Sequence, residues 1–171
     1  MQDAHARSAS TSDYAPVYVG ALPVHTIAGG AAKVNTPMLL TDFTQAVKAV
    51  GYTDDWANYD LCEAIYAHFV LRQAGPIVVI NVFDPEKNKE TKDVTATAVN
   101  NQAVLGDMGG VILDSFTVDG KERGADYTLS YDYMTERVTL KGVSKGVLDG
   151  ALSIHYEEVT PGIQAADVIG A

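Results

Sequence analysis

The sequence is short of cysteine, of positive charge and of long apolar runs, and each shortage excludes a class of protein. Its one cysteine, Cys62, cannot form a disulfide within the chain. The chain has 12 Lys and Arg and 22 Asp and Glu. Its Lys and Arg residues are not clustered, as binding to nucleic-acid phosphates would require. No window approaches the roughly 18 apolar residues of a membrane helix, and the opening MQDAHARSASTSD lacks the apolar segment of a secretory signal. We therefore expect a protein made in a cytoplasm, with no nucleic-acid and no membrane partner.

The sequence also shows few of the patterns that mark catalytic, cofactor or metal sites. No H-E-x-x-H occurs, no G-x-G-x-x-G follows a strand, and no serine, histidine and carboxylate stand out as a triad. The histidines are far apart and none has a second metal ligand at a suitable spacing: His5, His25, His68 and His155. We expect no catalytic, cofactor-binding or metal-binding residue, no cofactor and no enzyme activity.

Four features resemble sites but have simpler interpretations. The stretch Thr26–Lys33 is rich in glycine, yet it lacks the spacing of a phosphate loop and is interpreted as a loop. Asp54–Asp55 lies between two expected helices, where acidic residues serve as caps. Cys62 is interpreted as a small buried apolar residue, and His68 as a packed or surface histidine.

The most informative stretch is Val34–Asp84, which predicts a strand, two helices and a strand. Thr41 or Asp42 can cap the first helix, whose apolar residues recur at helical spacing, and Gly51 ends it. Asn58 or Asp60 can cap the second helix, and Gly75–Pro76 stops it. The following run, Ile77–Phe83, is almost continuously apolar, which is typical of a strand buried on both faces. This pattern predicts an α/β layer.

The remaining segments predict a second, β-rich part. Charged residues 84–93 predict a bridge and the best domain boundary, and β-branched residues and tyrosines separated by glycine turns then favour five or six antiparallel strands. The expected fold is α+β, an α/β layer followed by a small antiparallel β-sandwich. The expected parts are a flexible arm at 1–15, the α/β part at 16–93, the β-sandwich at 94–160 and the start of a continuation at 161–171.

The order of these segments resembles the tail sheath protein of contractile phages and phage-like bacteriocins. The resemblance extends from Pro16 onward and rests on these stretches: Pro16–Pro23, Val34–Pro37, Gly51–Trp56, Tyr59–Glu63, Gly75–Pro85, Gly124–Thr128 and Ala165–Gly170. Sheath proteins of this type continue into a larger α/β domain and a C-terminal domain. The resemblance therefore implies that this chain is an N-terminal fragment or a shortened product.

The resemblance implies a structural role in a virion tail or phage-like particle, made in the bacterial host cytoplasm. Sheath subunits stack as hexameric rings around an inner tail tube protein and exchange strands through terminal arms. The stack contracts to drive the tube through a cell envelope. The β-sandwich lies toward the outside of the sheath, so Tyr127, Tyr131 and Tyr133 are expected to serve the fold rather than contacts.

Two alternatives remain open at this point. One is a small α/β enzyme or ligand-binding domain with a β appendage, which would use the crevice beyond the carboxyl end of Ile77–Phe83. Asn81 and Asp84 are the polar groups that the sequence offers there. The other is a different virion or secretion-tube component with a related β insert.

Overall fold

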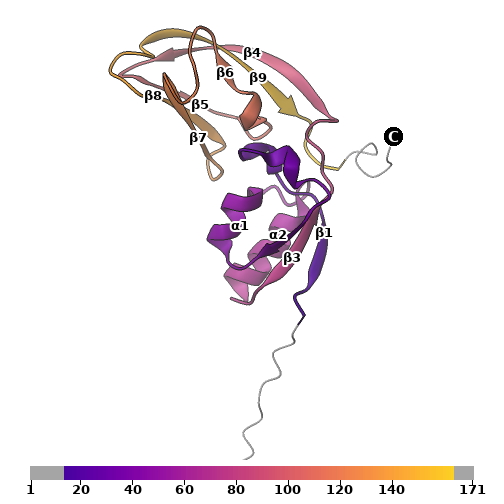
Figure 1. The fold of residues 1–171 in the computed structure, drawn as a ribbon. Helices are drawn as coiled ribbons and strands as arrows, with labels where there is room; N and C mark the ends of the chain where they lie inside the picture. Colours follow the sequence, from indigo (N-terminus) through magenta and orange to yellow (C-terminus); the bar gives the residue numbers. More distant parts are fainter. Residues whose placement is uncertain (1–13, 164–171) are drawn as a thin grey trace, which may run out of the picture.

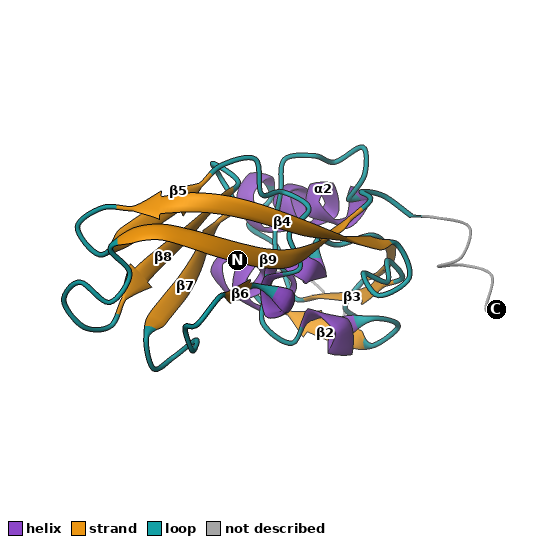
Figure 2. Cartoon of the chain, turned by 90° about the horizontal axis from the view of Figure 1, so that it is seen from above, coloured by secondary structure: helices purple, strands orange, loops and turns teal. Residues whose placement is uncertain are grey.

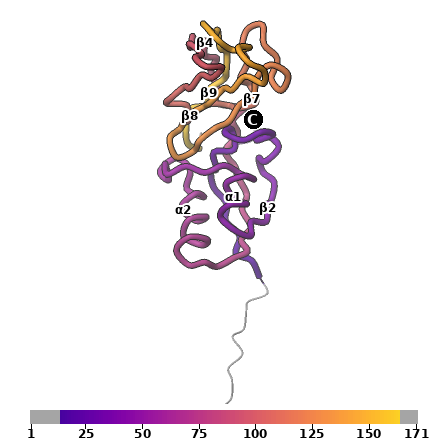
Figure 3. The backbone as a smooth tube through the Cα atoms, turned by 90° about the vertical axis from the view of Figure 1, so that its left-hand side faces the viewer, coloured from indigo at the N-terminus to yellow at the C-terminus, as the bar shows by residue number. Residues whose placement is uncertain are grey.

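The computed structural model describes residues 14–163 and has a mixed α+β fold, in which strands predominate. Figure 1 shows two parts, a helix-containing part below and a strand-rich part above, and Figure 3 shows them stacked end to end. The expected arm at 1–15 lies almost entirely outside the described residues, as does most of the expected continuation at 161–171. The domain limits expected from the sequence stay a prediction.

The first part contains a three-stranded sheet in the order β1-β3-β2, with β3 parallel to β1 and antiparallel to β2. Two α-helices lie on one face of this sheet in Figure 1. Its elements are β1 (Val17–Gly20), the 3-10 turns η1 (Val24–Thr26) and η2 (Gly30–Lys33), β2 (Pro37–Leu40), α1 (Phe43–Val50), α2 (Asp60–Tyr66), the π-helical turn η3 (Ala67–Leu71) and β3 (Ile77–Asn81).

The ends of the two helices were predicted with unequal success. The carboxylate of Asp42 accepts from the backbone N–H of Gln45 and caps α1, and Gly51 follows with φ +77°, as expected. The predicted cap of α2 is wrong, because Tyr59 occupies the N-cap position without a side-chain hydrogen bond. The Asp60 carboxylate accepts instead from the backbone N–H of Ala21, directly after β1, at 2.7 Å.

The prediction that β3 is buried on both faces is wrong. Burial alternates along it, so that Ile77 and Val79 are buried while Val78 and Ile80 are only partly covered. The helices pack against the first pair, and no helix of the described residues lies over the second (Figure 1). An apolar run without alternation cannot tell a strand covered on both faces from one whose second apolar face is open.

The second part contains two three-stranded antiparallel sheets, in the orders β4-β9-β6 and β5-β8-β7, which enclose one hydrophobic core (Figure 2). The strands are β4 (Lys89–Ala98), β5 (Gln102–Leu105), β6 (Thr117–Val118), β7 (Tyr127–Asp132), β8 (Arg137–Gly142) and β9 (Gly150–Val159), with the 3-10 turn η4 at Leu113–Ser115. Residues 84–93 are not simply a bridge, because β4 begins at Lys89 and pairs with Val159 of β9. Alternating charges there fit an exposed strand edge as well as a linker.

The two parts share contacts. Ile112 and Val159 of the β-rich part pack in the core of the first part, and Asn88 accepts a backbone hydrogen bond from Thr160 at the crossing point. His25 of η1 is bonded to the carbonyl of Gly109. Among the described residues, no helix has the length and apolar character needed to cross a membrane.

Candidate functional site

The outer edge of β1 is open within residues 14–163, where β1 pairs only with β3. The N–H of Val78 donates to the carbonyl of Pro16, and the N–H of Val82 donates to the carbonyl of Gly20. Since backbone groups alternate in direction along a strand, Val17 and Val19 turn their N–H and C=O away from β3. These groups can accept a further strand.

The outer edge of β2 is less suited to strand addition. The N–H of Val78 points to β1, so the backbone groups of Ile77 and Val79 point to β2, where Leu40 and Met38 lie opposite them. The backbone groups of Pro37 and Leu39 are therefore directed outward. Proline has no backbone N–H, so this edge offers fewer donors than β1. The sheet therefore has one favourable edge and one weak edge.

A groove runs beside the favourable edge, between β1 on one side and α2 and η3 on the other. It is lined by Tyr18, Asp60, Glu63, Ala64, Ala67, His68 and Arg72 and has a volume of about 420 Å³. The Tyr18 hydroxyl and His68 Nε2 are 2.7 Å apart, so β1 is held against η3 on this side. In strand addition the main chain supplies affinity and pockets for alternate side chains supply selectivity. Both components are present here.

The junction of β1 with α2 requires glycine at position 20. A Cβ on Gly20 would lie 2.4 Å from an Asp60 carboxylate oxygen. That carboxylate cannot move freely, because it holds the N–H of Ala21. Glycine thus allows the end of β1 to approach the start of α2 closely enough for this bond.

The sheet face opposite the helices is apolar and open among the described residues. Register places Val17, Val78 and Leu39 in one row across the three strands, and Val19, Ile80 and Pro37 in the next. Val17, Val19 and Leu39 are 59%, 61% and 56% exposed. A contiguous apolar patch of this kind marks an interaction surface on a folded protein. It borders the open edge of β1, and we call the two together the β1 surface.

Of the histidines and of the other candidate residues discussed above, His68 lies in the groove beside β1, where it contacts Tyr18. Asp55 accepts from the side-chain and backbone N–H groups of Asn58, which is the expected loop chemistry. Cys62 is fully buried, and burial raises the pKa of its thiol to about 12. His155 lies between Asp93 and Asp119, and their hydrogen bonds raise its pKa.

The glycine-rich stretch Thr26–Lys33 was expected to be a loop, but it contains the 3-10 turn η2. Its second glycine is required by packing rather than by a ligand. A Cβ on Gly30 would lie 1.7 Å from the carbonyl oxygen of Val24. The same segment is fastened by a bond from the N–H of Gly29 to the carboxylate of Asp114.

Two features were missed or misjudged in the sequence. Residues 142–146 have the spacing G-x-S-x-G, but Ser144 is exposed in a turn after β8 with no helix after it, so the strand-turn-helix context of a nucleophile is missing. Asn81 does not offer its side chain to a crevice. Its amide is buried, accepts from the N–H groups of Leu22 and Phe83, and donates to the Phe83 carbonyl.

Sequence reasoning also missed that Asp60 and Glu63 line a groove beside β1. Asp60 was expected only as a possible cap of the second helix, and no role was predicted for Glu63. The sequence holds no signal for this groove, because Gly20 and Asp60 are far apart along the chain and only the fold brings them into contact. In residues 14–163 no three histidine, cysteine or acidic side chains are grouped so that they could hold a metal ion.

Comparison with known protein families, with curated proteins and with solved structures finds no match to this chain.

Proposed function

We propose that this chain is a structural subunit of a contractile tail sheath, which polymerises around an inner tail tube and shortens to drive it through a cell envelope. Its partners are further copies of the subunit and the tail tube protein, in a virion tail or phage-like particle. The observation that carries the proposal is the β1 surface, where an open strand edge adjoins an open apolar sheet face. The order of segments in this chain, which resembles that of sheath proteins, also supports the proposal.

Strand addition suits a polymer that must change shape without falling apart. Main-chain hydrogen bonds hold an incoming segment at the edge of β1, and the apolar face gains by being covered. Segments joined in this way act as hinges between rigid bodies, which can rotate while the connections persist. A subunit of this design needs no cofactor and no catalytic residue.

The same proposal gives each of the two parts of the chain a place in the sheath subunit. The two sheets around the second core are assigned to the β-sandwich insert of sheath subunits, exposed on the outside of the particle. The first sheet, with its helices, is assigned to the scaffold that forms the ring contacts. This arrangement puts the β1 surface among the contacts between subunits.

The enzyme alternative has no comparable support at the place where it was expected. It would use the region beyond β3, where Asn81 is fully engaged in holding the backbone of Leu22 and Phe83. Asp84 accepts there from the N–H of Glu86, in a local turn. The polar groups at this end of the strand therefore have structural partners.

Light scattering over a concentration series, followed by negative-stain microscopy of the largest species, tests the proposal. We expect mass to rise with concentration and the largest species to be rings or tubes. A monomer at every concentration contradicts the proposal, and a saturable thermal shift with a small metabolite would favour the enzyme alternative.

A further inference from the structure

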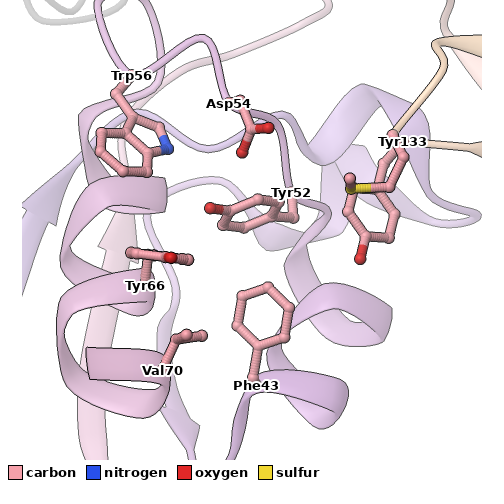
Figure 4. Close-up of a pocket in the computed structure, with 8 residues that line it drawn as sticks. Phe43, Tyr52, Asp54, Trp56, Tyr66, Val70 and Tyr133 are labelled. Carbon is pink, nitrogen blue, oxygen red and sulfur yellow. The ribbon is translucent and has the colours of Figure 1, made fainter. Parts of the chain in front are cut away.

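A pocket lined mainly by aromatic side chains lies where the two parts of the chain meet. Its volume is about 570 Å³, and it is formed by α1, the 51–59 loop, the second helix and the turn between β7 and β8. Figure 4 shows the lining side chains, which are Phe43, Tyr52, Asp54, Trp56, Tyr66, Val70, Tyr133 and Met134. Five of the eight are aromatic, one is a carboxylate and none is cationic.

The aromatic rings form walls at steep angles to one another. Tyr52 makes edge contacts with Phe43 at 5.0 Å and 71°, and with Tyr133 at 5.6 Å and 83°. Trp56 and Tyr66 form a second, tilted pair at 5.5 Å. Each ring carries negative charge density on its faces, so an array of rings around one space attracts a cation.

Two buried polar atoms at the pocket lack hydrogen-bond partners. They are the hydroxyl of Tyr52, a residue only 3% exposed, and the indole Nε1 of Trp56. Burial raises the pKa of Tyr52 to about 12, and the neighbouring side chains of Trp56 and Asp54 also act on it. Since buried polar groups are nearly always bonded, this pair indicates a missing partner. Figure 4 shows them beside the carboxylate of Asp54.

These groups together define what the partner must offer. The Asp54 carboxylate and the Tyr52 oxygen can accept hydrogen bonds, whereas the Trp56 N–H can only donate one. An arginine residue satisfies all three, because its guanidinium donates in a flat fork and stacks on aromatic faces, and its backbone carbonyl accepts. A neutral apolar ligand would leave the buried Trp56 N–H without a partner.

We propose that this pocket binds an arginine residue of another polypeptide, with the guanidinium against the aromatic walls and paired with Asp54. The chain's net charge of −10 favours the approach of a cationic segment. The site draws on both parts of the chain, since Phe43 and Asp54 come from the first and Tyr133 from the second. The occupant therefore bridges the junction between them.

Trp56 makes the test direct, because it is the only tryptophan and its fluorescence reports this pocket alone. The wild-type chain is titrated with N-acetyl-arginine methylamide and, separately, with the citrulline derivative, which has nearly the same shape but no charge. We expect a saturable change in Trp56 emission with the arginine derivative and binding at least about tenfold weaker for citrulline, a difference of about 1.4 kcal/mol.

The Asp54→Asn variant is expected to weaken arginine binding by about tenfold or more, since it removes the counter-ion. Glu122→Gln is the matched control, because it removes one negative charge from an exposed residue that precedes β7 and does not line the pocket, so binding should be unchanged. The comparison of two ligands on the wild type does not depend on any variant.

The proposal is overturned if the two derivatives bind equally, or if neither changes the emission at tens of millimolar. A further measurement identifies the donor of the arginine. If the arginine derivative reduces the self-association of the chain, the donor is a second copy. If binding is intact and association is unchanged, the donor is a different polypeptide.

Discussion

His25 donates its Nε2–H to the carbonyl oxygen of Gly109 across 2.9 Å, and this bond joins the two parts of the chain. A carbonyl only accepts, so the bonded nitrogen carries the proton and the other ring nitrogen, Nδ1, is bare in the neutral ring. That nitrogen is buried without a partner. Burial lowers the pKa of His25 to about 4, because a charged ring would lose its hydration there.

This relationship predicts a loss of stability in mild acid. The unfolded chain takes up a proton on His25 near pH 6.5, whereas the folded chain does so only near pH 4. As the pH falls from 6.5 to 4, His25 should therefore lower the free energy of unfolding by about 1.4 kcal/mol per pH unit. This contribution adds to those of the other titratable groups. Denaturant unfolding of the wild type and of His25→Gln at several pH values measures the difference.

The stability lost between pH 7 and pH 5 should be smaller in His25→Gln than in the wild type. His155 contributes with the opposite sign in both proteins, because its pKa is raised and its charged form stabilises the fold at low pH. Equal pH dependence in the two proteins would show that His25 is not the group that responds.

The glycines at positions 29 and 30 provide a test of why this segment is rich in glycine. A Cβ at position 30 would collide with the backbone carbonyl of Val24, so Gly30→Ala should destabilise the fold by more than about 3 kcal/mol. Gly29 has open space around it and φ +68°, so Gly29→Ala should cost only about 1–2 kcal/mol. Denaturant midpoints compare the two, and an equal or reversed order would refute the packing explanation.

The contact between Gly20 and Asp60 predicts a specific cost at the end of β1. Gly20→Ala should displace the Asp60 carboxylate from the N–H of Ala21 and destabilise the fold by about 1–3 kcal/mol. Gly106→Ala is the control, since a Cβ there meets nothing within 4 Å. Thermal unfolding provides the measurement, and amide exchange at Ala21 should accelerate in the first variant only.

The sequence predicted the local features of the fold better than its surfaces. The cap at Asp42 and the glycine after α1 are local signals, and both are confirmed. The open face of β3 could not be predicted, because covered and uncovered apolar strands have the same composition. The π-helical turn at Ala67–Leu71 was also missed, and so was the short strand Gln102–Leu105, whose pairing with β8 depends on residues far along the chain.

The aromatic pocket was beyond sequence reasoning for a related reason. Phe43 and Tyr133 are distant in the chain, and the sequence around each of them predicts only an ordinary core or turn position. Tyr133 was expected to serve the fold alone. Only the packing of the β7–β8 turn against the 51–59 loop brings these side chains to one space.

The most direct test of the account is light scattering of Val19→Pro beside Val19→Thr. Proline removes the outward backbone N–H at position 19 and leaves the hydrogen bonds between β1 and β3 intact. Threonine keeps that backbone N–H and has a side chain of similar shape to valine. If β1 is the edge that recruits neighbours, the wild type and Val19→Thr grow in mass with concentration and Val19→Pro stays monomeric. Association of Val19→Pro equal to that of the wild type would contradict the account.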